Sequence, residues 1–200
     1  MAYKTVSTLV QDVIRRLRQV PGVGTQTYAE TAITDLLIET YIMASRHRWW
    51  DNLMTWGSFQ LDGVNGRLTT ALALRNGFDD VRAVFVGNNA HKLPILGSQN
   101  PNGLRGSYPR YIEPIKFADV SANGPFRVWP LTAVTTSDKP LNIHYRDDST
   151  LDFTNAATTM PFDAVVLVNL TAAKYAASDG ANPGDVLRLE SVGQDRLMQV

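Results

Sequence analysis

The hydrophobic residues of this chain change their period along the sequence, and that change limits the folds it can adopt. Between Thr27 and about Trp50, apolar side chains recur every three to four residues, the spacing of one helix face. From Trp56 they alternate with polar residues, as in a strand with one buried side. Helical spacing returns after Met160. The sequence therefore predicts an α+β protein, with helices at both ends and strands in the middle.

Two helices are predicted before the strands. The first covers residues 8–20, where Thr8 and a glutamine three positions later have the spacing of a capping box. The second covers residues 27–50 and opens with a similar pair, Thr27 and Glu30. A short turn containing Pro and Gly separates the two segments. We therefore expect an antiparallel helix hairpin, with further helices covering its remaining apolar surface.

Three arginines lie toward the C-terminal end of the first helix, where positive charge interacts favourably with the helix dipole. Such a cluster is either a solvated helix face or a surface that meets DNA or an acidic partner. These candidate interface residues are Arg15, Arg16 and Arg18.

The second helix ends in RHRWWDNLMTW, which holds three of the four tryptophans. Large aromatic side chains at a helix end usually fill the boundary between two layers of a fold. The run from Arg46 to Trp50 could instead stack on nucleic acid, because it combines basic and aromatic residues. Packing at the junction of the helical and β segments is expected for Trp49, Trp50 and Trp56.

About six short strands follow, separated by turns rich in Gly, Asn and Asp. Their number and spacing predict a small antiparallel sandwich or open barrel. Residues 97–109 lack periodicity, and a loop of this length often contacts a partner. The predicted strands cover residues 56–61 with a return at 67–70, 81–86 with a short return at 92–95, 111–117, 126–131 and 141–146.

Two more helices are predicted at the C-terminal end. The sequence from Met160 to Asp163 resembles a helix start with proline in the first turn, and the helix continues to about Ser178. Asn182 is expected to cap a last helix that begins at Pro183. That last segment is only weakly amphipathic, and chain ends of this kind are often ordered only on docking.

Composition excludes several classes of protein. The 19 basic and 19 acidic residues cancel, whereas a general electrostatic binder of nucleic acid carries a basic excess. There is no cysteine, which excludes disulfide scaffolds and thiolate chemistry. The first residues lack the apolar core of a signal peptide, and no apolar run is long enough to span a bilayer. We expect a soluble protein without a cofactor.

No catalytic or metal-binding motif is present. The three histidines, His47, His91 and His144, stand in different elements without the spacing of metal ligands. Phosphate-binding and hydrolase motifs are also missing. The acidic DDSTLD segment (residues 147–152) is either a hard-cation site or a solvated turn, and the EF-hand spacing and glycine are absent. The pattern favours the turn.

The order of these segments resembles the head-to-tail adaptor proteins of short-tailed phages, similar to the tail tubular protein A family. The resemblance starts with the helix pair that ends in RHRWWDNL and passes into WGSFQLDG. It continues through the GSYPRY, FRVWPL and LNIHYR segments. It closes with TLD and the helix that begins MPFDAVVLVNLTAAKYAA, so that it spans about residues 7–178.

The resemblance implies one helical domain built from residues 1–56 and 151–200, with a β domain of residues 57–150 inserted between them. It further implies a virion protein, made in the host cytoplasm, that forms a dodecameric ring beneath the portal protein. Such a ring would link the portal to a tail nozzle or fibre protein, and genomic DNA would pass through it during ejection without sequence-specific binding.

Site residues follow from the same resemblance. The arginines of the first helix become candidates for an interface or the channel surface. Contact with the distal tail component is expected from Asn100, Arg105 and Tyr108. Docking to the portal is expected from Arg196, Leu197, Met198 and Val200.

Two other functions remain open. One is a sequence-tolerant nucleic-acid-binding protein that uses the Arg46–Trp50 cluster with loop 97–109. The other is a hydrolase built on His47 or His91 with nearby carboxylates.

Overall fold

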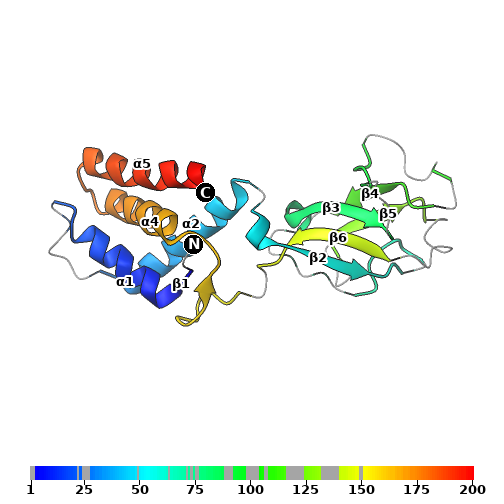
Figure 1. The fold of residues 1–200 in the computed structure, drawn as a ribbon, viewed down its shortest axis with the longest axis horizontal. Helices are drawn as coiled ribbons and strands as arrows, with labels where there is room; N and C mark the ends of the chain where they lie inside the picture. Colours follow the sequence, from blue (N-terminus) through cyan, green and yellow to red (C-terminus); the bar gives the residue numbers. More distant parts are fainter. Residues whose placement is uncertain are drawn as a thin grey trace. The chain divides into compact units, whose positions relative to one another are not determined.

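A computed structural model describes residues 3–21, 23, 28–48, 50–62, 64–70, 72, 74, 77–87, 92–97, 104–105, 108–115, 124–131, 140–148 and 151–200. The chain divides into two compact units (Figure 1). One is Met1–Asn52 together with Leu151–Val200, and the other is Leu53–Thr150. The first contains the helices and the second contains two antiparallel sheets, so the predicted α+β class is confirmed.

The helical unit is organised around its third helix. It contains α1 (Val6–Leu17), α2 (Glu30–Arg46), α4 (Ala164–Ser178) and α5 (Pro183–Gln199). Helix α4 packs against each of the other three, and Figure 1 shows it between α1 and α5. Helices α1 and α2 touch one another, as expected of a hairpin, but both pack more extensively on α4. A two-stranded ribbon, β1 (Lys4–Thr5) with β7 (Thr159–Met160), joins the two ends of the unit.

The start of α1 differs from the prediction. Thr5, not Thr8, caps the helix: its hydroxyl accepts a hydrogen bond from the backbone N–H of Thr8 at 3.3 Å. Strand pairing with β7 is the physical reason, because it holds Thr5 in the extended conformation that an N-cap residue needs. The helix also ends earlier, at Leu17, and not at residue 20.

The ends of α2 also differ. The helix begins at Glu30 after Ala29, which makes no side-chain cap, while Thr27 lies outside the described residues. It ends at Arg46 rather than near residue 50. A single 3-10 turn, Asp51–Leu53, then leads directly into the first long strand.

Helix α4 begins later than predicted. Its cap is Asp163, whose carboxylate accepts hydrogen bonds from the N–H groups of Val165 at 2.9 Å and Val166 at 3.2 Å. The predicted start with Pro161 in the first turn is therefore wrong, since Pro161 follows β7 and precedes the cap. The end at Ser178 is confirmed, as is the start of α5 at Pro183 with Asn182 as its cap.

The β unit contains a three-stranded and a two-stranded antiparallel sheet. Strands β2 (Met54–Phe59), β6 (Leu141–Arg146) and β3 (Val81–Val86) form the first, with β6 in the centre. Strands β4 (Tyr111–Pro114) and β5 (Phe126–Trp129) form the second. Leucine, isoleucine, valine and Phe126 side chains from both sheets share one buried core. The strands described here do not close into a barrel.

Strands at residues 81–86 and 141–146 are confirmed at both ends. The predicted returns at 67–70 and 92–95 pair with neighbouring segments but are not full strands. The first makes one isolated bridge, Leu61 to Leu68, and the second makes two, Phe85 to Lys92 and Ile95 to Ile112. The strands predicted at 111–117 and 126–131 are shorter, ending at Pro114 and Trp129. Strand β2 begins at Met54, inside the segment assigned to the helical domain.

Helix α5 lies close to α4 at Gly193. A Cβ atom there would lie 2.6 Å from both Cγ and Cδ2 of Leu170, too close for van der Waals contact. Alanine has a helix propensity roughly 1 kcal/mol better than glycine, but the clash outweighs that gain. We predict that Gly193→Ala lowers the free energy of unfolding by about 1–2 kcal/mol. Denaturant unfolding followed by circular dichroism measures this.

The matched control is Gln194→Ala, since Gln194 is the next residue of α5 and is exposed. It should change stability by less than about 0.5 kcal/mol. A Gly193→Ala variant as stable as this control would show that the two helices do not pack this closely.

Asp62 organises the turn after β2. Its carboxylate accepts hydrogen bonds from the N–H groups of Asn65 at 2.6 Å and Val64 at 3.1 Å. Burial alone raises the pKa of Asp62, but these backbone donors outweigh it and hold the pKa below its ordinary value. A carboxylate with a lowered pKa stabilises the fold above its unfolded pKa of about 3.9, and the effect is lost as pH falls through the folded pKa.

The amide signals of Val64 and Asn65 should therefore stay constant from neutral pH to about pH 4 and move together below it. Nuclear magnetic resonance titration records this directly. In an Asp62→Asn variant, which keeps an acceptor but cannot ionise, the same signals should not titrate. Identical titration in both proteins would contradict the assignment.

Candidate interaction surfaces

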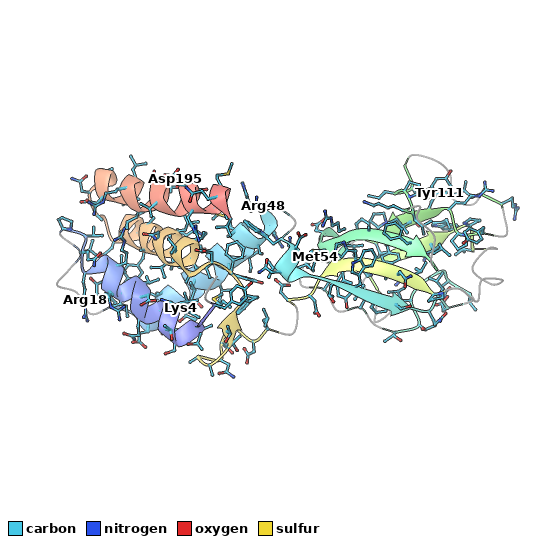
Figure 2. All side chains as sticks on the ribbon, in the orientation of Figure 1. Lys4, Arg18, Arg48, Met54, Tyr111 and Asp195 are labelled. Carbon is cyan, nitrogen blue, oxygen red and sulfur yellow. The ribbon has the colours of Figure 1, made fainter. Side chains whose placement is uncertain are left out.

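The three arginines singled out from the sequence have different surroundings. Arg15 is exposed and pairs with Asp12 at 2.8 Å. Arg16 is half-buried, and its Nε donates to Oδ1 of Asn169 on α4 at 3.1 Å. Arg18 follows the last residue of α1 and is exposed (Figure 2). Arg16 therefore holds α1 on α4, and the other two remain available to a partner.

A groove lies beside Arg16 along one side of α4. Its volume is about 430 Å³, and it is bordered by α1 on one side and α5 on the other. Val165, Val168 and Val192 provide its apolar part, with Val165 46% and Val192 38% exposed. The polar border comes from the β1–α1 segment and α4: Lys4, Asp12, Arg16 and Asn169. The lysine Nζ lies 2.6 Å from the carboxylate of Asp12.

A second, larger cavity of about 610 Å³ is lined by Tyr3 and Asp163, which directly precede the groove residues Lys4 and Ala164. Trp50 and Phe162 form its aromatic wall, and their rings meet edge to face with centroids 5.0 Å apart. The Arg48 guanidinium lies 4.0 Å from the centroid of the Trp50 ring. Asp163 also lines this cavity, and its charge is balanced by Arg196 at 3.0 Å. The two charges of that pair therefore neutralise each other within the helical unit.

The four residues expected to dock on the portal differ in how far their side chains are exposed. Arg196 donates two hydrogen bonds to Asp163, and Leu197 is 2% exposed. Both side chains stabilise α5 on α4: Leu197 is buried, and Arg196 is used in the ion pair although its side chain is 41% exposed. Met198 is 69% exposed and Val200 lines the larger cavity, so both remain accessible. The weakly amphipathic last segment is a helix packed on α4.

The tryptophans also have opposite environments. Trp50 is 6% exposed and its indole N–H donates to the carbonyl of Ala44 at 3.0 Å. Trp56 is 59% exposed on the outer face of β2, where it stacks on His144 with centroids 4.5 Å apart. The expectation that Trp56 is a packed junction residue is wrong, because the alternation of β2 directs it away from the core. Trp49 lies outside the described residues.

Loop 97–109 is described only in part. Asn100 lies outside the described residues. Arg105 is exposed, whereas Tyr108 is half-buried against the core of the β unit. Of the three residues expected to contact a distal tail component, Arg105 is the one whose side chain this structure leaves accessible.

The candidate catalytic and metal-binding residues stand on different elements of the fold. His47 is exposed just after α2, His144 is stacked on Trp56, and His91 lies outside the described residues. Within the described part of the chain, no group of three His, Asp or Glu side chains is arranged to hold a metal ion. In the same part, none of the helices has the length and apolar character needed to cross a bilayer.

The DDSTLD segment is described at residues 147–148 and 151–152. The hydroxyl of Thr154 donates to Asp152 at 2.5 Å and its N–H donates at 3.0 Å, and these bonds lower the pKa of Asp152. Asp148 is buried, close in sequence to the buried ion pair of Arg146 and Asp80, whose atoms are 3.1 Å apart. Asp152 therefore accepts hydrogen bonds at the start of a turn that begins at Phe153.

Sequence reasoning missed the apolar side chains that α2 leaves exposed. Ile38 and Ile42 are half-exposed and Met43 is 42% exposed, so apolar side chains reach the surface on more than one side of this helix. The signal was present in the sequence, because apolar residues occur on every side of this helix. The groove valines were also missed, since their exposure depends on how α1 and α5 pack beside α4.

A scan against protein families finds no family that matches the chain, and a search of curated proteins finds no matching protein.

Replacing the tryptophans tests these opposite environments. Trp50→Ala removes a buried ring and an indole hydrogen bond, which should cost about 3–5 kcal/mol of unfolding free energy. Trp56→Ala removes two ring contacts of an exposed side chain, with His144 and Phe85, and should cost less than about 1.5 kcal/mol. Denaturant unfolding measures both values.

Fluorescence quenching provides an independent control. Trp56→Phe should remove a component that acrylamide quenches readily, whereas Trp50→Phe should leave that component in place. An equal loss of stability in both alanine variants would contradict the assigned environments.

Proposed function

We propose that this protein is a structural adaptor of a phage virion, which forms a ring beneath the portal and links the capsid vertex to the tail. The observation that carries the proposal is the architecture: both ends of the chain build one helical unit around α4, and the β unit is inserted between them. That is the arrangement expected from the resemblance to head-to-tail adaptors. The work of such a protein is done by its surfaces and not by a reaction.

Surface composition supports the same proposal. The helical unit leaves Val165 and Val192 exposed beside the groove on α4, and Met43 exposed on α2. The apolar strip of the groove suits an interaction site. Zero net charge also suits a channel wall, because a strongly basic lining would hold the DNA by counterion release.

The alternative of nucleic-acid stacking by the Arg46–Trp50 cluster receives less support. The Trp50 ring is buried and the Arg48 guanidinium lies over it, so this ring has no free face for a base. The exposed Trp56 is a more suitable stacking residue, but it belongs to the β unit and not to that cluster.

Mass measurement tests the proposed function. The purified chain, alone and mixed with its portal protein, is examined by analytical ultracentrifugation and native mass spectrometry. We expect a closed ring or a stoichiometric complex with the portal, and no complex with a portal protein from an unrelated phage. A chain that stays monomeric and does not bind its portal protein would contradict the proposal.

A further inference from the structure

Three aromatic rings meet on the solvent-facing side of the three-stranded sheet. The Trp56 ring is 59% exposed and lies parallel to the His144 ring, with an interplanar angle of 3° and centroids 4.5 Å apart. The Phe85 ring contacts it at a tilt, with centroids 5.7 Å apart. These two contacts fix the position of the indole, whereas an isolated surface side chain would sample several rotamers. The exposed ring is therefore held in place before a partner binds, which lowers the entropic cost of binding.

Strand pairing shows which side chains accompany Trp56. Residues directly opposite each other in antiparallel strands lie on the same face of a sheet. Ser58 and Phe85 are both opposite Asn142 on β6, and Phe85 is also opposite Lys92 through an isolated bridge. The leucine, isoleucine and valine residues that alternate with them along β3 and β6 belong to the buried core. The outward surface, called here the Trp56 face, is defined by Trp56, Ser58, Phe85, Lys92, Asn142 and His144.

One face of the indole ring remains open. Strand β2 is at the edge of the three-stranded sheet, next to β6 (Figure 1). The two rings that touch Trp56 come from β6 and β3, so they approach it from the same side. The exposed area of Trp56 therefore lies on the side of the ring away from these contacts. A flat ligand can stack on such a surface.

The polar groups beside the indole can both donate and accept hydrogen bonds. Ser58 is exposed and lies two residues along β2, roughly 7 Å from Trp56. Its hydroxyl supplies one donor and two acceptor sites. Asn142 donates from its amide nitrogen to the carbonyl of Gly87 at 2.6 Å, which leaves its amide oxygen as an acceptor. This mixture suits the hydroxyl groups of a ligand, because each hydroxyl also donates and accepts.

The charges near this surface disfavour a polyanion as the ligand. Lys92 is the cation that strand pairing places on the Trp56 face, and Arg82 lies at the bulge of β3. No carboxylate is among the residues that define the face. A surface for single-stranded nucleic acid instead follows the phosphate backbone with many cations. The Trp56 face is therefore better suited to a neutral ligand.

A protein partner would need a wider apolar surface. Standard protein interfaces bury roughly 800 Å² on each partner around an apolar centre. Among the described residues of the β unit, the other strongly exposed large apolar side chains are Val64 and Ile95. Val64 lies in a turn after β2, and Ile95 bridges to Ile112 of β4 in the other sheet. Neither extends the apolar surface of Trp56, and one ring among polar groups matches a single sugar ring.

We propose that the Trp56 face binds a neutral carbohydrate. A pyranose ring stacks on the open face of the indole, because the C–H groups on one side of a sugar are attracted to the negative face of an aromatic ring. The sugar hydroxyls bond to Ser58 and to the amide oxygen of Asn142. This inference goes beyond the proposed adaptor function, since it uses the β unit alone and needs no contact between subunits.

Titration with neutral hexasaccharides tests the inference. The full chain is titrated with maltohexaose, cellohexaose, xylohexaose and chitohexaose, and nuclear magnetic resonance records the backbone amide signals of Trp56, Ser58 and Asn142. At least one of these saccharides should move the three signals in a saturable manner. The same saccharide should protect the exposed tryptophan from acrylamide quenching. High salt should not weaken the binding, because the ligand carries no charge.

Variants locate the binding on this face. Trp56→Ala should weaken the binding by roughly tenfold or more, because it removes the stacking surface. Ser58→Ala removes one exposed hydroxyl without disturbing the rings and should weaken the binding by roughly threefold. The matched control is Val64→Ala, a position that is 77% exposed and outside the face, which should bind like the unmodified chain. Circular dichroism checks that each variant is folded.

Other outcomes overturn the inference in distinguishable ways. If none of the four saccharides moves the signals, or if Trp56→Ala binds as tightly as the unmodified chain, the Trp56 face does not bind carbohydrate. Salt-sensitive binding of oligothymidylate without saccharide binding would identify a nucleic-acid surface instead. Protection of Trp56 from acrylamide by the portal protein, and by none of the saccharides, would identify a protein contact. None of these results contradicts the adaptor function, which the mass measurement tests separately.

Discussion

The packing of α4 is the constraint on which the helical unit depends. This helix is in contact with three others, and its buried residues include Val166, Leu167 and Leu170. Small residues allow the close approach: Ala172, Ala173 and Ala176 are buried on α4 itself. A helix covered on so many sides must be apolar around most of its circumference, and α4 is. The N-terminal helices fold against a segment that lies more than a hundred residues later in the chain.

A discontinuous unit of this kind requires an insert whose two ends are close together. The β unit satisfies this requirement through its own hydrogen bonding. Its first strand, β2, pairs with its last, β6, and Met54 is directly opposite Arg146. The chain therefore enters and leaves the β unit at neighbouring positions, and the order of strands within the insert can vary without disturbing the helices.

The surfaces that remain after folding are the observations behind the proposed interaction function. Charged groups near the core are used internally: Asp163 with Arg196, Arg16 with Asn169, and Asp80 with Arg146. Apolar side chains also remain exposed, among them Val165 and Val192 beside the groove and Met43 on α2.

The sequence by itself determined which segments are helical and which are extended, because side-chain period is a local property. Strands β3 and β6 and the cap of α5 were predictable residue by residue for this reason. Tertiary structure decided the other helix starts, since the caps at Thr5 and Asp163 depend on the β1–β7 ribbon that positions them. Tertiary structure also decided which side chains are exposed. Trp50 and Trp56 are the same residue type six positions apart, yet one is buried at a helix end and the other faces outward from a strand. Burial depends on what packs opposite each side chain, and no local pattern contains that information.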